Sequence, residues 1–82
     1  MDRIGFPLVR VTWIDAASSD DWIDLDDVVH TCPTIVTVGH LIAEWDEGIT
    51  LAMNYDAENE SVAMTLNIPN HWIEDLRELK LV

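Results

Sequence analysis

Basic residues are scarce in this chain of 82 residues, which contains four Lys or Arg and sixteen Asp or Glu. Between Val11 and Leu76 no Lys or Arg occurs for 66 residues, and fourteen of the sixteen carboxylates lie in that stretch. A net charge of −12 repels phosphates and attracts basic surfaces. We therefore expect neither direct nucleic-acid binding nor association with an anionic membrane, and we expect a protein partner with a basic surface.

Cysteine and long apolar runs are also scarce. Cys32 is the only cysteine, which excludes a disulfide within the chain. The first residues contain no apolar run typical of a secretory leader, and no run approaches the roughly 18 apolar residues of a membrane-spanning helix. These absences predict a cytoplasmic location, and the length predicts a single domain over residues 1–82.

Apolar residues nevertheless make up 49% of the chain, and in several segments they alternate with polar residues. Residues 8–13 place Val9, Val11 and Trp13 on one face, as a half-buried strand requires. Near the other end, residues 73–81 fit either a strand or a short helix. We favour a strand that pairs with residues 8–13.

The clearest alternation occurs in residues 49–55 and 61–68, which predict two strands. The polar segment 56–60 between them has the length of a hairpin loop, so the two strands should pair. The expected inward side chains are Ile49, Leu51, Met53 and Tyr55 in one strand and Val62, Met64, Leu66 and Ile68 in the other.

A longer extended segment covers residues 34–45, where the alternation changes phase near Gly39 and predicts a bend or bulge. The sequence Asp-Glu-Gly that follows predicts a tight turn with positive φ at Gly48. Pro69 should end the last of the alternating strands, and one helical turn should follow it.

Residues 18–33 are rich in Asp and lack alternation. Within them, residues 24–29 predict a short helix with Asp24 as its N-cap and with Leu25, Val28 and Val29 on one side. The carboxylates of Asp26 and Asp27 would then lie in the first turn, where the helix dipole favours negative charge.

The element order predicts an all-β fold, and 82 residues suit a small five-stranded barrel with a short helix in the first long loop. This order resembles the SH3-like and Sm-like barrels. Residues 9–15, 37–41, and 68–69 leading into 73–76 are also similar to a group of small tailed-bacteriophage proteins. The resemblance implies a phage accessory protein with such a barrel, in a ring as one arrangement, located in the host cytoplasm. It implies no functional residues.

Metal binding and catalysis find little support in the sequence. Zinc requires three or four converging ligands with paired spacings, and the chain offers His30, Cys32, His40 and His71. Nucleophilic catalysis by Cys32 with one of the histidines is no better supported. Calcium would require a Gly in register and a distal bidentate Glu, which do not accompany Asp15, Asp20, Asp21, Asp24, Asp26 and Asp27. We expect no metal, no cofactor and no enzymatic activity.

Two groups of residues are candidates for interaction. Trp22 lies in the Asp-rich loop and, with Asp15, Asp20 and Asp21, forms the candidate interaction surface. Arg10, Arg77 and Lys80 belong to the terminal strands and, if these pair, form a candidate basic patch. A molecule with one small positive side suits head-to-tail packing in a homo-oligomer, with a ring as one outcome.

Two other functions are compatible with the charge. The chain could imitate nucleic acid and inhibit a host DNA-binding, RNA-binding or defence enzyme, with carboxylates in the place of phosphates. More weakly, Arg10, Arg77 and Lys80 could bind a nucleotide messenger at a subunit interface. We rank the interaction or ring-assembly module first.

Overall fold

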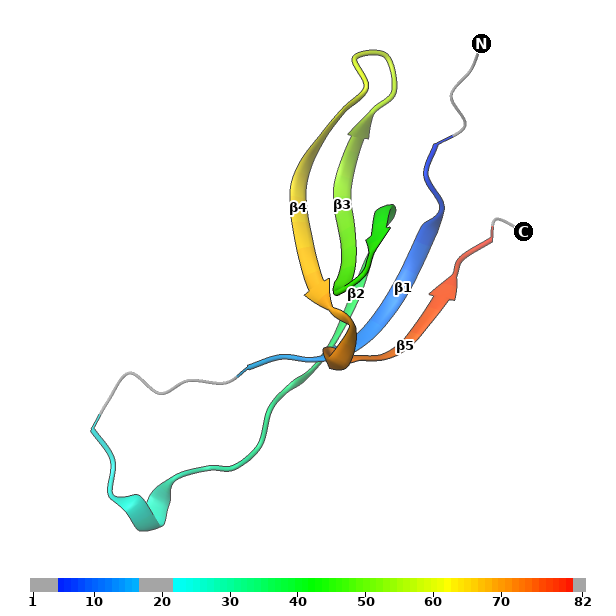
Figure 1. Ribbon diagram of the computed structural model, residues 1–82. Coiled ribbons are helices and arrows are strands. Elements are labelled where there is room, and N and C mark those ends of the chain that lie inside the picture. The colour runs from blue at the N-terminus through cyan, green and yellow to red at the C-terminus, as the bar shows by residue number, and fades with distance from the viewer. Residues whose placement is uncertain (1–4, 17–21, 81–82) are drawn as a thin grey trace.

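Strands account for most of the chain in the computed structural model, which describes residues 5–16 and 22–80. Two 3₁₀ turns, η1 (Leu25–Asp27) and η2 (Asn70–Trp72), are the only helical segments in these residues. The strands are β1 (Leu8–Ile14), β2 (Thr34–Trp45), β3 (Gly48–Asp56), β4 (Ser61–Pro69) and β5 (Ile73–Glu78) (Figure 1). The all-β class is confirmed, and the last segment forms a strand rather than a helix.

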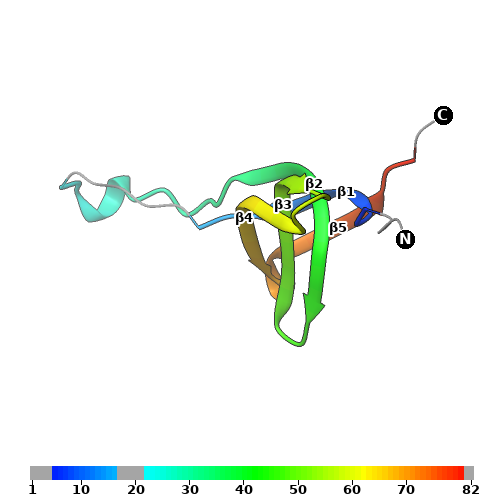
Figure 2. The same cartoon turned by 90° about the horizontal axis from the view of Figure 1, so that it is seen from above.

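All five strands belong to one antiparallel sheet with the order β4-β3-β2-β1-β5. The last strand pairs with the first, as expected. Figure 2 shows that the sheet is strongly curled. The end strands β4 and β5 share no ladder within the described chain, so the expected barrel is not closed.

The core lies on the inner face of the curled sheet. Its buried side chains come from β1, β3 and β4, and they are Val9, Val11, Trp13, Ile49, Leu51 and Ile68. Because β1 and β3 are not neighbours in the sheet, these side chains meet only through its curvature. The Trp13 ring stacks on Trp72 of η2 with 6.4 Å between centroids, and its Nε1–H donates to Oγ1 of Thr37 at 3.0 Å. The turn η2 therefore helps to cover one end of the core.

The outer half of the β3–β4 hairpin departs from the expected burial. Met53 and Val62 are exposed although they were expected to point inward, and Met64 is 72% exposed. Met64 has a φ of 58°, which takes it out of the extended conformation that alternation requires. The buried residues of the hairpin lie near its other end, between Gly48 and Ala52 and at Ile68. The alternation of apolar and polar residues therefore extends beyond the part of the hairpin that the core covers.

Both glycine expectations are corrected. Gly39 pairs regularly with Val9, and the irregularity in β2 lies instead between Leu41 and Ala43. A Cβ on Gly39 would lie 3.0 Å from Cε of Met53 and 3.1 Å from the carbonyl oxygen of Ala52, so the backbone is closely packed there. Gly48 does not have positive φ. It is needed because a Cβ would collide with the carbonyl oxygen of Ile68 across the β3–β4 ladder.

The helix expected over residues 24–29 is shorter than predicted. Only η1 forms, and the side chain of Asp24 at its N-cap makes no capping hydrogen bond. Leu25, Val28 and Val29, which were expected on one side of the helix, are exposed. A 3₁₀ turn of three residues presents no continuous apolar face, and no layer of the described fold covers it.

Candidate interaction site

The connection between β1 and β2 leaves the sheet as an arm, which we define as residues 22–33. At its base the N–H of Asp15 donates to the carbonyl oxygen of Pro33 at 2.9 Å. From there the arm extends away from the strands, with η1 near its far end (Figures 1 and 2). The molecule consequently measures 60 Å along its longest axis and 27 and 25 Å across.

Every residue of the arm is exposed, including its apolar side chains. Trp22 is fully exposed, Leu25 is 90% exposed and Val29 is 74% exposed. Asp24, Asp26 and Asp27 lie among them, and the arm contains no Lys or Arg. A concentration of large exposed apolar side chains is typical of an interaction surface. The arm therefore combines apolar contact area with negative charge.

The residues of the predicted interaction surface are placed unequally. Trp22 lies on the arm, whereas Asp15 lies at its base, where its carboxylate accepts a hydrogen bond from the N–H of Ala16 at 2.8 Å. Asp20 and Asp21 lie outside the described residues. Leu25 and Val29 are not among the predicted interaction residues, because the sequence pattern places them on one side of a short helix. The three aspartates around Leu25 were the signal that this segment faces solvent.

The predicted basic patch is brought together in part. Arg10 of β1 and Arg77 of β5 are direct cross-strand partners, so their side chains lie on the same face of the sheet. The Nε–H of Arg77 donates to Oδ2 of Asp75 at 2.9 Å, which offsets part of the positive charge. The ladder ends before Lys80, although the N–H of Leu79 still donates to the carbonyl oxygen of Leu8.

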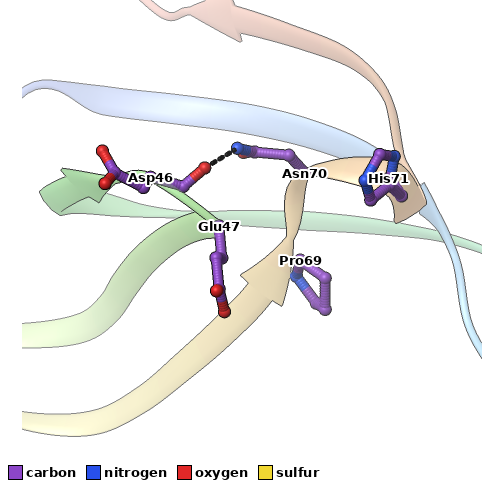
Figure 3. A pocket seen from close by; sticks show the side chains of 5 residues that line it. All are labelled: Asp46, Glu47, Pro69, Asn70 and His71. Atoms are coloured by element: carbon purple, nitrogen blue, oxygen red, sulfur yellow. Dashed lines mark hydrogen bonds between the residues drawn. The ribbon is translucent and has the colours of Figure 1, made fainter.

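A shallow hollow of about 470 Å³ lies between η2 and the β2–β3 turn, lined by Asp46, Glu47, Pro69, Asn70 and His71. Asn70 holds the two segments together, since its Nδ2–H donates to the Asp46 carbonyl oxygen at 3.1 Å and its backbone N–H to that of Glu47 at 2.8 Å. Figure 3 shows that the two carboxylates and the imidazole point in different directions. They do not form a constellation around one reacting atom.

The soft metal ligands are dispersed. His30 and Cys32 are exposed on the arm, His71 lines the hollow, and the Nδ1 of His40 lies 3.2 Å from the carbonyl oxygen of Phe6. In residues 5–16 and 22–80, no three His, Cys, Asp or Glu side chains gather as a metal site. No helix among these residues is long and apolar enough to cross a membrane.

Tyr55 of β3 has a buried polar atom. The hydroxyl of Tyr55 is buried and has no hydrogen-bond partner in the described part of the chain. Its ring packs edge-on against Phe6, with 5.3 Å between centroids, and tilts toward the ring of His40 at 6.4 Å. These contacts hold the segment before β1 against the sheet, so the tyrosine has a packing role.

The β3–β4 turn contains the carboxylate with a clear electrostatic shift. Asp56 accepts a hydrogen bond from the side-chain Nδ2–H of Asn59 at 2.8 Å and bonds from the backbone N–H groups of Asn59 and Glu58. These donors favour the ionised form, and the side chain of Asn59 contributes most to lowering the pKa of Asp56 below its ordinary value of 3.8. The arrangement closes the turn and is structural.

Comparison with protein-family models, with curated proteins and with solved structures finds no match for this chain. Its function is therefore inferred from the arm, the sheet and their charges.

Proposed function

We propose that this chain is a non-enzymatic protein-interaction and assembly module that binds its partner through the arm. The observation that carries the proposal is the exposure of Trp22, Leu25 and Val29 on a segment that extends away from the sheet. Burying such side chains stabilises a complex by about 25 cal/mol for each Å² of apolar surface removed from water. The arm has the apolar area for binding and is not covered by its own sheet.

The charge of the arm supports a basic partner. Asp24, Asp26 and Asp27 keep the apolar side chains in solution in the free molecule and would pair with cations on the partner. Tryptophan is enriched among the residues that dominate binding energy, so Trp22 is the expected anchor. Carboxylates around it would repel acidic surfaces and so contribute to specificity.

We propose no catalytic role for the hollow beside η2. Its carboxylates and imidazole point apart, and general acid–base chemistry requires groups within hydrogen-bond reach of one substrate.

We further propose that the chain is encoded by a tailed bacteriophage. An accessory protein of a tailed bacteriophage, acting in the host cytoplasm, is compatible with a small acidic module of this kind. The order of strands and the turn η2 before β5 support an SH3-like or Sm-like arrangement of the sheet, in an open form.

Site-specific photocrosslinking tests the proposal. Benzoylphenylalanine replaces Leu25 in one variant and Met64 in a control, because both side chains are highly exposed but only Leu25 lies on the arm. In cells that produce the chain, we expect an adduct of defined mass from position 25, competed by excess unlabelled chain and abolished by Trp22→Ala. Position 64 should not produce it. Identical adducts from both positions, or none from position 25, would contradict the proposal.

A further inference from the structure

We infer that the partner of the arm is a second copy of this chain, which receives the arm on the outer face of β1, β2 and β5. This inference rests on the proposed function and names its partner. Its basis is a strip of exposed side chains on the face of the sheet opposite the core, which we call the outer strip: Leu8, Arg10, Val36, Val38 and Arg77.

The ladder register creates the outer strip. Arg10 of β1 is paired with Val38 of β2 on one side and with Arg77 of β5 on the other. The side chains of these three residues therefore form a row across three neighbouring strands on the same face of the sheet. Val36 and Leu8 flank that row because they are paired with Thr12 and His40. Val36 and Val38 are exposed although most apolar residues of β1 and β3 are buried. The sheet therefore has a second surface with exposed apolar side chains, which residues 5–16 and 22–80 leave uncovered.

The arm and the outer strip are complementary. The arm contributes Trp22, Leu25 and Val29 together with carboxylates. The outer strip contributes valines together with the guanidinium groups of Arg10 and Arg77, the second of which is already paired with Asp75 on the same face. Lys80, which follows Leu79 at the edge of β5, is the only other Lys or Arg in the described residues. A second copy therefore offers the acidic arm one surface on which apolar contact and positive charge occur side by side.

Charge also determines the conditions for this contact. Two copies of net charge −12 repel one another over long distances. At about 0.15 M salt, however, charges more than about 8 Å apart are largely screened, while pairs in contact are screened less. The local attraction between Asp24, Asp26 or Asp27 and Arg10 or Arg77 can then act together with apolar burial.

The two surfaces lie on different parts of one molecule, since the arm points away from the strands that carry the outer strip (Figure 1). A contact between arm and strip joins two different surfaces and allows two arrangements: two copies exchange arms about a two-fold axis, or each copy gives its arm to one neighbour and receives the arm of another. The second arrangement produces a closed ring when the rotation between copies permits, and an open chain otherwise.

A mixing experiment tests this geometry. One variant carries Trp22→Ala and Leu25→Ala and lacks a functional arm; the other carries Arg10→Glu and Arg77→Glu and lacks a functional strip. Sedimentation velocity at about 0.15 M salt measures the mass of each. The unaltered chain should exceed the monomer mass of 9.3 kDa, and each variant alone should sediment as a monomer. An equimolar mixture should form a dimer of one copy of each, because one intact arm meets one intact strip.

One control and a second strip variant keep the experiment decisive. Met64→Ser removes an apolar side chain that is 72% exposed and lies outside both surfaces, and it should leave the mass distribution unchanged. Val38→Ser changes the strip without altering its charge. It should raise the dissociation constant of self-association by at least about tenfold. Circular dichroism measures whether each variant is folded.

Three results would overturn the inference. They are a monomeric unaltered chain at every concentration, loss of association in the arm variant but not in the strip variants, and a mixture that stays monomeric. The second result indicates an arm-to-arm contact. If the purified chain is monomeric while Leu25 still crosslinks to another protein, the second copy is excluded and the proposed function stands. If neither occurs, both fail.

Discussion

The sheet and the arm differ in the burial of their apolar side chains, and two leucines show the difference. Leu51 of β3 is fully buried and is paired with Leu41 and Leu66 on its two sides, whereas Leu25 of η1 is 90% exposed. The neighbours that bury Leu51 come from distant parts of the chain, while the hydrogen bonds around Leu25 are local. An apolar side chain is buried where strand pairing places residues from distant parts of the chain against it. The hydrophobicity of the residue alone does not ensure its burial.

The largest expected effect compares these two leucines directly. Leu51→Ala removes contacts on every side and leaves a cavity, so the free energy of unfolding should fall by about 3 kcal/mol. Leu25→Ala should change it by less than about 0.5 kcal/mol, because the side chain is already in water. Urea denaturation at the lowest workable concentration measures both without a contribution from association. Equal losses would mean that the arm packs on the sheet in solution.

A second comparison concerns glycines at different packing densities. Gly48→Ala places a methyl group against the carbonyl oxygen of Ile68 and should reduce the free energy of unfolding by about 2 kcal/mol. Gly5→Ala is the matched control, since its Cβ would lie 3.8 Å from Cε2 of Tyr55, which is ordinary contact. The control should change stability by less than about 0.5 kcal/mol. If Gly48→Ala is equally mild, the β3–β4 ladder is looser than described.

Tyr55 allows a smaller test within the sheet. Tyr55→Phe removes a buried hydroxyl that has no partner in the described residues, so stability should stay constant or rise by up to about 1 kcal/mol. Thr37→Val removes the acceptor of the Trp13 Nε1–H and should instead reduce stability by about 1 kcal/mol. Thermal unfolding of both variants measures these changes in stability. A marked loss of stability in Tyr55→Phe would reveal a partner for the hydroxyl.

The smallest effect is the pH dependence of the β3–β4 turn. The pKa of Asp56 is lowered in the folded chain, mainly by the side chain of Asn59. Its contribution to stability is therefore fully present above the ordinary pKa of 3.8 and is lost as the pH falls from there through the lowered folded pKa. Asn59→Ala should move the pKa of Asp56 back toward 3.8.

An NMR titration of the Asp56 carboxyl carbon measures this shift. Asn54→Ala, on the same hairpin but outside the hydrogen bonds to Asp56, serves as the control and should leave the titration unchanged. An unaltered pKa in Asn59→Ala would show that the backbone donors suffice.

Period-two alternation predicted the strands well because it depends on a local property of the extended chain. Val9, Val11 and Trp13 share a face in any straight strand, and all three are buried. The stop at Pro69 was equally predictable, since proline lacks the N–H that a ladder needs, and η2 begins at the next residue. At Val62 the same pattern failed, because alternation indicates a shared face and does not report whether another layer covers it. At Met64 a φ of 58° also takes the residue out of the extended conformation.

The candidate site was predictable only in part. The exposure of Trp22 agrees with its place in an acidic loop, but Leu25 and Val29 were assigned to a helix side that η1 is too short to form. The pairing of Arg10 with Arg77 depended on a strand-strand register that no local signal contains.

By itself, the sequence determined an all-β chain, the approximate limits of its strands, and a segregation of charge that leaves basic residues near the two ends. These follow from side-chain chemistry and short-range geometry. Only the tertiary structure decided that the sheet stays open between β4 and β5, that Gly39 and Gly48 serve close packing, and that the arm is uncovered. The physical reason is that register, curvature and burial arise from contacts between residues far apart in the chain, which local patterns do not encode.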